Sequence, residues 1–198
     1  MADKVVHGYW GIRGAGQTSR LLLAYCGAVW EDVKYTSPEQ WFGKDKAELN
    51  LPFPNLPYLI DGDLKLSESS AIQRHIIRKY GKNDLFGKTL ADQAWVDVIM
   101  GVYTDIRNAI GPLFWDKEWE AKFPAALEKS LPKIQKIADF YGEKEFALGY
   151  VTLADFHLSE FSYYFEKIAP EEYAKFPFAK RVREAFENLP EIKKYYEQ

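Results

Sequence analysis

The sequence predicts a chain in two parts, a mixed α/β part followed by an all-helical part. Up to Gly81, short stretches with strand-like alternation are interleaved with stretches of helical spacing. From Thr89 onward, every periodic stretch has helical spacing. The polar connection GKNDLFGK separates the two patterns. We therefore expect one domain over residues 1–82 and a second, all-helical domain over residues 90–198.

The first part has the order strand, helix, strand, then strand, strand, helix. The six stretches, in that order, are KVVHGYW, TSRLLLAYCGA, WEDVKYT, NLPYLI, LKL and SESSAIQRHIIRKYG. A Gly-rich turn, GIRGAGQ, follows the first strand, and Asp61-Gly62-Asp63 predicts the turn of a hairpin. Thr18 or Ser19 lies near the start of the first helix. A βαβ–ββα half with a proline before its third strand, here Pro57, resembles a thioredoxin-like fold.

The second part contains five predicted helices. They run from Leu90 to about Trp115, then near Pro124–Tyr141, Leu153–Ile168, Pro177–Asn188 and Pro190–Tyr196. Two of them begin with Thr-x-x-Asp, a pattern close to a capping box, at Thr89 and Thr152. We expect Asp155, the acidic residue of the second pattern, to cap its helix rather than to act in catalysis.

Composition excludes several classes of function. The net charge is −3, and the sequence therefore lacks the basic surplus that is typical of proteins that bind nucleic acid or an anionic membrane. No apolar run is long enough for a membrane span, and the N-terminus lacks the apolar core of a secretory signal. The single cysteine, Cys26, excludes an internal disulfide framework and fits a reducing compartment. These features together lead us to expect a cytoplasmic protein. Because the histidines have no metal-ligand spacing, we expect no metal site.

Two segments predict a site for a small peptide. If the bond before Pro57 is cis, as the thioredoxin-like resemblance implies, the backbone of Leu56 faces outward and can pair with an extended peptide. The alternative is a trans proline that ends a loop. Ser67 to Ser70 open a helix, whose N-terminus can hold a carboxylate on Ser69 while Glu68 receives an ammonium group. Here the alternative is that the serines only cap the helix.

Five stretches, taken together and in order, resemble a cytosolic glutathione transferase. They are GYWGIRG, QW, FPNLPYLIDGD, the serine-rich helix start and TLADF. The first and third most resemble the mu class, whereas TDIRNAI is similar to sigma-class enzymes as well. The resemblance implies an enzyme that conjugates the glutathione thiolate to electrophilic, mostly apolar small molecules in detoxification, with no cofactor beyond glutathione as co-substrate. The alternatives are a glutathione-dependent isomerase of sigma type and a non-catalytic ligand-binding protein, like ligandins or crystallins.

The resemblance assigns Tyr9 as the catalytic residue, whose hydroxyl donates a hydrogen bond to the glutathione sulfur and so favours the thiolate. It also implies a glutathione site in which the cysteinyl part contacts Leu56 and Pro57, and the γ-glutamyl part contacts Glu68 and Ser69. The glycyl carboxylate is expected to contact Trp41, Lys46 and Asn55, and Trp10 to shape the pocket. Counting back from Phe53 favours Lys46 over Lys44.

The resemblance also implies a homodimer and a second-substrate site. Phe53 and Arg74 match interface positions, and Asp105 matches an acidic residue that reaches the partner's glutathione. The second substrate is expected near Gly11, Ala15, Arg107, Gly111 and Trp115. Trp115 stands where mu enzymes carry a tyrosine, so it offers an N–H but no phenol. The sequence ends at Gln198 without the tail that covers this site in mu enzymes, so a more open pocket is expected.

Overall fold

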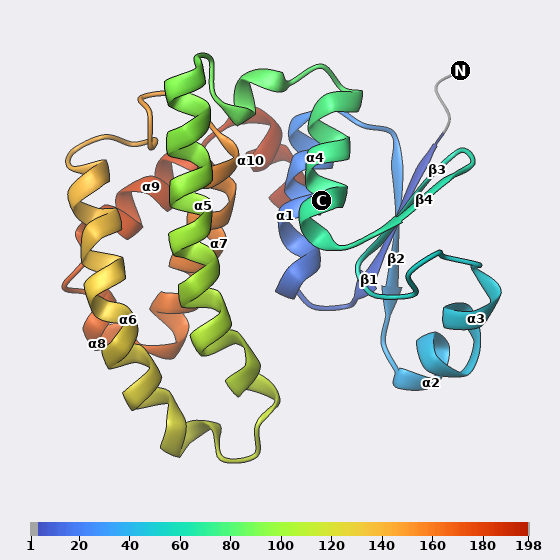
Figure 1. The fold of residues 1–198 in the computed structure, drawn as a ribbon, viewed down its shortest axis with the longest axis horizontal. Helices are drawn as coiled ribbons and strands as arrows, with labels where there is room; N and C mark the ends of the chain where they lie inside the picture. The colour runs from blue at the N-terminus through green and yellow to red at the C-terminus, as the bar shows by residue number, and fades with distance from the viewer. Residues whose placement is uncertain (1–3, 198) are drawn as a thin grey trace. The chain divides into compact units, whose positions relative to one another are not determined.

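A computed structural model describes residues 4–197 of the chain, which form two compact units. The first unit contains the described residues up to Asn83 together with the final segment from Pro190 (Figure 1). The second unit comprises Asp84–Leu189. The final helix therefore groups with the α/β unit, although the sequence pattern places it in the helical domain. Its grouping follows from packing between segments distant in sequence, which a local pattern does not report.

The first unit is built on a four-stranded mixed sheet in the order β2-β1-β3-β4. Its strands are β1 (Val5–Trp10), β2 (Trp30–Tyr35), β3 (Tyr58–Asp61) and β4 (Leu64–Ser67). The strands β1 and β2 are parallel, whereas β3 is antiparallel to both of its neighbours. The turn between β3 and β4 contains Gly62 with a positive φ of 58°, a conformation that glycine adopts without a steric penalty. The predicted order of these strands along the chain and the predicted hairpin are thus confirmed.

Three helices of the first unit matter for the site: α1 (Gln17–Tyr25), α4 (Ser69–Lys79) and α10 (Pro190–Tyr196). The helix α1 packs beside both α4 and α10, and α4 also contacts the hairpin (Figure 1). Thr18 and Ser19 do not cap α1, because a 3₁₀ turn, Gly14–Gly16, precedes it and both side chains are buried.

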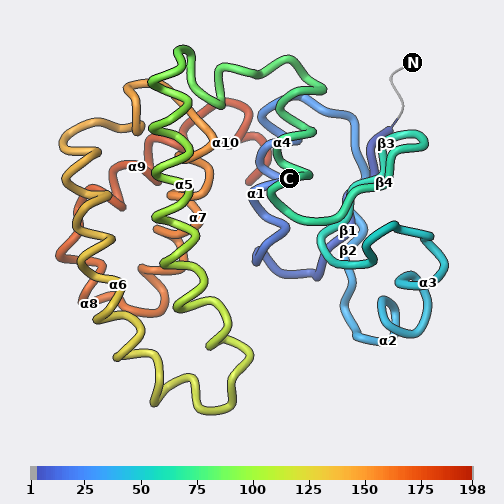
Figure 2. The backbone as a smooth tube through the Cα atoms, viewed as in Figure 1, coloured from blue at the N-terminus to red at the C-terminus, as the bar shows by residue number. Residues whose placement is uncertain are grey.

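Between β2 and β3 the chain forms two short helical turns joined by a π-helical turn. They are α2 (Pro38–Gln40), the π turn Trp41–Asp45 and α3 (Lys46–Glu48) (Figure 2). The segment is attached to the sheet by an aromatic cluster in which the ring of Trp41 stacks on Tyr58, with centroids 6.1 Å apart. Tyr35 joins this cluster and donates a hydrogen bond from its hydroxyl to Asp45 at 2.7 Å.

The second unit is helical. Its elements are α5 (Leu90–Ile110), a 3₁₀ turn (Gly111–Trp115), α6 (Trp119–Tyr141), α7 (Leu153–Ile168), α8 (Pro170–Tyr173) and α9 (Pro177–Glu187). The helix α5 ends at Ile110 rather than near Trp115, because Pro112 has no N–H for the α-helical ladder. The helix α6 begins before the predicted start at Pro124 and continues through both Pro124 and Pro132.

Asp155 caps α7 as predicted, and it does so from a buried position. Its carboxylate accepts hydrogen bonds from the Thr152 backbone N–H at 2.7 Å and the Thr152 hydroxyl at 2.8 Å. It also accepts from the backbone N–H of Ala147 at 2.8 Å and the hydroxyl of Tyr141 at 2.9 Å. One side chain thus joins the start of α7 to the end of α6 and to the connection between them. Burial raises the pKa of Asp155, while these hydrogen bonds oppose the rise.

Over residues 4–197, no helix combines the length and the apolar character that crossing a membrane requires.

Candidate functional site

Tyr9 lies near the end of β1, with its side chain only 7% exposed. The turn Gly14–Gly16 lies against its ring. A Cβ atom built on Gly14 would be 2.7 Å from the Tyr9 hydroxyl oxygen, and one built on Gly16 would be 2.5 Å from the ring carbon Cδ1. Both positions therefore require glycine, since any side chain would displace the turn from the tyrosine. The glycines of the turn GIRGAGQ thus allow its backbone to lie close against the Tyr9 side chain.

The hydrogen bonding of Tyr9 leaves its proton available. The backbone N–H of Ala15 donates to the Tyr9 hydroxyl oxygen at 3.0 Å. A phenol can accept and donate at once, and within residues 4–197 the Tyr9 O–H has no acceptor. The hydroxyl is thus oriented by one donor and is able to donate to a ligand. This is the arrangement that stabilisation of a thiolate requires.

Arg20 binds the backbone that leads from β1 into this turn, a role that the sequence pattern did not predict. Its side chain is 3% exposed and donates to the carbonyl oxygens of Ile12 at 2.7 Å and Trp10 at 3.1 Å. Its Nε also contacts both carboxylate oxygens of Asp32, at 3.0 and 3.1 Å. The guanidinium carbon lies 5.8 Å from the centre of the Tyr9 ring. An arginine directly before the apolar run LLLA was the signal available in the sequence.

Asp32 is shared between Arg20 and the fully buried His7, whose Nδ1 lies 3.3 Å from its Oδ1. Burial disfavours the ionised carboxylate, but hydrogen bonds from His7 and Arg20 outweigh that effect and lower the pKa of Asp32. For His7, burial lowers the pKa and the hydrogen bond to Asp32 opposes the change. At neutral pH, His7 is therefore favoured as the neutral imidazole and Asp32 as the ionised carboxylate.

The second group of predicted site residues lies around Pro57. The Leu56–Pro57 bond is cis, as the resemblance to a thioredoxin-like fold implied. The Leu56 N–H donates to the side-chain oxygen of Asn55 at 2.9 Å, and Asn55 Nδ2 donates to Glu68 Oε1 at 3.2 Å. Glu68 has a φ of 69°, an uncommon conformation for a residue other than glycine, and Ser69 begins α4 directly after it. The structure thus brings Asn55, Leu56, Pro57, Glu68 and Ser69 together.

The remaining predicted contacts for glutathione lie on the segment between β2 and β3. Trp41 is buried in the aromatic cluster with Tyr35 and Tyr58. Lys46 places its ammonium group 5.3 Å from the ring centre of Phe42, which in turn lies 6.2 Å from the ring of Trp10. The choice of Lys46 over Lys44 for the glycyl carboxylate stays a prediction.

The predicted second-substrate residues fall in three places. Gly11 and Ala15 belong to the first unit. Arg107 and Gly111 line a small cavity of about 80 Å³ in the second unit, and its other walls are almost wholly apolar. The full lining comprises Tyr103, Ile106, Arg107, Ile110, Gly111, Phe114, Leu127, Phe161, Tyr164, Phe165 and Ile168. Burial in this apolar surrounding raises the pKa of Tyr103.

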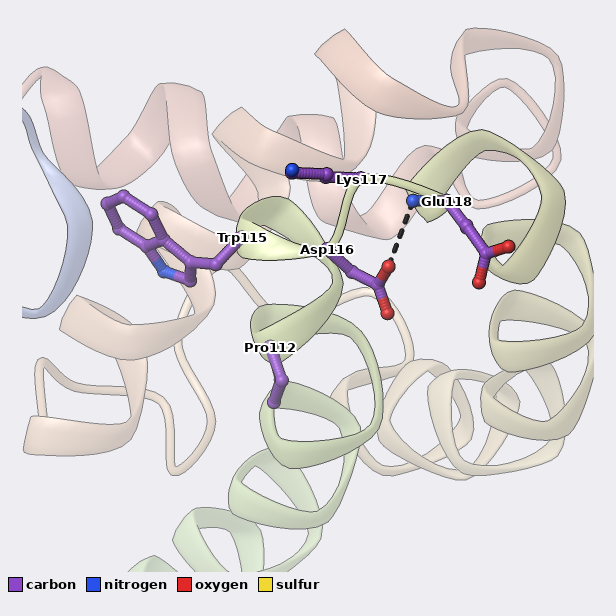
Figure 3. Close-up of a pocket in the computed structure, with 5 residues that line it drawn as sticks. All are labelled: Pro112, Trp115, Asp116, Lys117 and Glu118. Atoms are coloured by element: carbon purple, nitrogen blue, oxygen red, sulfur yellow. Dashed lines mark hydrogen bonds between the residues drawn. The ribbon is translucent and has the colours of Figure 1, made fainter.

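Trp115 does not line that cavity. It is 76% exposed and borders a wide, open hollow with Pro112, Asp116, Lys117 and Glu118 (Figure 3). Asp116, another lining residue, accepts a hydrogen bond from the backbone N–H of Glu118 at 2.9 Å, shown dashed in Figure 3. Gly111 and Trp115 belong to the same 3₁₀ turn, but only Gly111 lines the cavity with Arg107.

The Cys26 thiol and metal-binding side chains are the other groups that we considered for chemistry. Burial raises the pKa of the Cys26 thiol to about 11, so it is protonated at neutral pH and is no nucleophile. Among residues 4–197, no cluster of three or more His, Cys, Asp or Glu side chains could hold a metal ion.

The two units correspond to two domains of a single known class of protein. A thioredoxin-like sheet domain, with a turn-bound tyrosine on its first strand, is followed by a helical domain. Residues 5–78 match the family model for the glutathione S-transferase N-terminal domain, and residues 104–198 match that for the C-terminal domain.

Individual relatives agree with the two domain matches. The chain is 33% identical over 201 residues to a glutathione S-transferase of Tyrophagus putrescentiae, covering 98% of this chain and 90% of the relative. It is 35% identical over 192 residues to the class-mu 26 kDa isozyme 7 of Fasciola hepatica, covering 95% and 86%. A solved glutathione S-transferase of the hookworm Necator americanus, described as monomeric, superimposes with a TM-score of 0.81 at 29% identity, covering 98% and 97%.

The chain belongs to the glutathione S-transferase family. It is therefore an enzyme that uses glutathione as co-substrate, and mu-class relatives are among the proteins that it matches. This confirms the resemblance of the sequence motifs and the fold class that they implied.

Proposed function

We propose that this transferase conjugates the glutathione thiolate to small, mostly apolar electrophiles in detoxification, with Tyr9 as its catalytic residue. The observation that carries the proposal is the hydrogen bonding of Tyr9. Its hydroxyl accepts from Ala15 and so directs its own proton away from the turn. A fixed donor aimed at a developing or resident negative charge is the commonest way in which enzymes stabilise such a charge.

The free-energy scale of this interaction is sufficient for catalysis. An unperturbed thiol has a pKa of about 8.5, so only a few per cent is thiolate at neutral pH. A hydrogen bond to a charged group contributes about 1.5–3 kcal/mol, which equals a lowering of the pKa by about one to two units. Tyr9 alone can thus bring the pKa of the bound thiol to about 6.5–7.5, so that a large share of it is thiolate at neutral pH.

We place glutathione along the Leu56 edge and the start of α4. The γ-glutamyl carboxylate binds at Ser69, where an eleven-residue helix begins and its N-terminal end favours an anion. Glu68 receives the γ-glutamyl ammonium group. In the structure the Leu56 N–H is paired with Asn55, so the cysteinyl backbone must replace the Asn55 side chain at that donor. Trp41, Lys46 and Asn55 complete the proposed site at the glycyl carboxylate, and Trp10 shapes the pocket.

The electrophile is proposed to be apolar, on the basis of the cavity in the second unit. Its lining has one charged residue, Arg107, among aromatic and aliphatic side chains. With a volume of about 80 Å³, it accepts only part of a small molecule. We propose that Arg107 and Gly111 contact the part of the second substrate in this cavity, and that Gly11, Ala15 and Trp115 contact other parts of it.

We also propose a cytoplasmic homodimer. Phe53, 78% exposed, is the residue that would insert into the partner, and Arg74 would lie near the two-fold axis. Asp105, which would reach the partner's glutathione, is exposed and forms an ion pair with Lys133 at 2.5 Å. That ion pair must open or be shared for Asp105 to act on glutathione.

The ultraviolet absorbance of bound glutathione thiolate, measured against pH, tests the role of Tyr9. We expect the wild type to form the thiolate well below the pKa of the free thiol, and Tyr9→Phe to raise that pKa by about one to two units. Glutathione affinity, measured by calorimetry, should change far less. If glutathione binds with an unshifted titration in the wild type, the protein is a ligand carrier rather than a conjugating enzyme. Turnover of an endoperoxide without conjugation would instead favour the sigma-type isomerase.

A further inference from the structure

The helix α10 contacts the turn that orients Tyr9. Arg13 donates from Nη2 to the hydroxyl of Tyr196 at 3.0 Å, and its guanidinium carbon lies 5.5 Å from the centre of the same ring. Gln17 Nε2 donates to the hydroxyl of Tyr195 at 3.4 Å. Two consecutive tyrosines of α10 thus bind the two residues that flank Gly14–Gly16.

Arg13 and Gln17 are the two ends of a single closed turn. The backbone N–H of Gln17 donates to the carbonyl of Arg13 at 2.9 Å. Ala15 lies at the centre of this turn, and its N–H holds the Tyr9 hydroxyl. Because hydrogen bonds weaken steeply with distance and angle, a small shift of either end changes the interaction at Tyr9.

The helix α10 is packed against the rest of the first unit. Ile192 of α10 is fully buried, and α10 packs along α1 (Figure 1). Gln17 is also buried, so its side-chain amide needs a partner, which the Tyr195 hydroxyl supplies. Arg13 is more exposed, and we expect its contact with Tyr196 to contribute less than a buried one.

We propose that Tyr195 and Tyr196 are positioning residues for Tyr9. They fix the two ends of the Arg13–Gln17 turn, and through the Ala15 N–H they set how strongly the Tyr9 hydroxyl stabilises the glutathione thiolate. Neither tyrosine touches substrate in this role. The inference rests on the proposed function of Tyr9 and adds to it a contribution from residues more than 180 positions away in the chain.

The test is the double variant Tyr195→Phe/Tyr196→Phe, which keeps both rings and removes both hydroxyls. The matched control is Tyr80→Phe at the end of α4, in the same unit and away from the turn. We expect the pKa of the bound glutathione thiol to rise in the double variant. At neutral pH, kcat/KM for an aryl halide should fall about two- to tenfold, the worth of one or two hydrogen bonds. The loss should lie in kcat rather than in KM for glutathione.

The pH profile separates positioning from general loosening of the fold. Above the pKa of the free thiol, the thiolate forms without help, so the double variant should regain most of the wild-type rate. A loss that is equal at every pH would overturn the proposal, as would a thiol pKa that equals that of Tyr80→Phe. Tyr9→Phe is measured in parallel. If Tyr9→Phe raises the thiol pKa and the double variant does not, only the role of α10 fails. If Tyr9→Phe has no effect, the proposed function fails and the inference fails with it.

Discussion

Two glycines allow the backbone to reach the Tyr9 hydroxyl. Gly14 has a positive φ of 40°, and a Cβ on either Gly14 or Gly16 would meet the tyrosine at 2.7 Å or less. The resulting contact puts an N–H on the tyrosine oxygen without using any side chain. Arg20 then completes the support by binding the carbonyls of Trp10 and Ile12. The Tyr9 hydroxyl, which is proposed to be catalytic, is therefore oriented by a main-chain N–H group, and side-chain patterns in the sequence represent such groups poorly.

The buried His7 predicts a dependence of stability on pH. Its pKa is lowered in the fold, mainly by burial. As the pH falls, His7 therefore takes up a proton at about pH 6.5 in the unfolded chain, while in the folded protein its imidazole is still neutral. Stability should therefore fall as the pH drops below about 6.5, by at most about 1.4 kcal/mol per pH unit from this residue. Urea unfolding of the wild type at pH 5 and pH 7.5 measures the effect.

The variant His7→Asn can still donate to Asp32 but cannot titrate in this range, so its stability should vary less between the two pH values. Asp32 acts in a lower window. Its pKa is lowered in the fold, so its contribution is present above about pH 4 and is lost only as the pH falls through the folded value. Equal pH dependence in His7→Asn and the wild type would show that another group is responsible.

At the scale of elements, two helices begin with the same Thr-x-x-Asp capping box in different surroundings. In α5 the box of Thr89 and Asp92 is solvent-accessible, and in α7 the box of Thr152 and Asp155 is buried. The sequence predicted both caps, because the pattern is local. It did not predict that Asp155 would also accept hydrogen bonds from Tyr141 and Ala147.

This difference predicts unequal costs for the same substitution. Asp155→Ala should lower the free energy of unfolding by about 3–5 kcal/mol, since it leaves several buried donors without a partner. Asp92→Ala removes an accessible cap and the hydrogen bond that Asp92 accepts from the Tyr150 hydroxyl at 2.8 Å, and it should cost clearly less because these groups can reach water. Denaturant unfolding of the two variants measures the comparison. Similar losses in both would contradict the view that Asp155 joins α6 to α7.

At the scale of the whole molecule, the oligomeric state decides whether Asp105 can serve a neighbouring site. Phe53 carries the test, because its side chain is exposed and it is proposed to insert into the partner. We expect a dimer by analytical ultracentrifugation at micromolar concentration, and Phe53→Ser should be largely monomeric with little change in secondary structure. The control is Val29→Ser, another exposed apolar residue of the same unit, which should stay dimeric. A wild-type monomer, as described for the hookworm relative, would remove the proposed role of Asp105.

The amino-acid sequence alone predicts the order of the elements, the family, and the residues proposed for glutathione and its chemistry. These follow from local signals: strand alternation, helical spacing, Thr-x-x-Asp starts and short motifs such as FPNLPYLIDGD. Helix ends were less accurate, as α5 and α6 show, because capping and tertiary packing choose among nearly equivalent ends.

The contacts between residues that are distant in sequence became known only from the three-dimensional structure. The contacts of Arg20 with Asp32, of Asn55 with Glu68, and of α10 with the Tyr9 turn all join separate segments. A linear pattern reports on neighbours within a turn or a strand, whereas such contacts depend on how the sheet and helices pack. The physical reason is that hydrogen bonds and burial act through space, so residues far apart in the chain can complete one site.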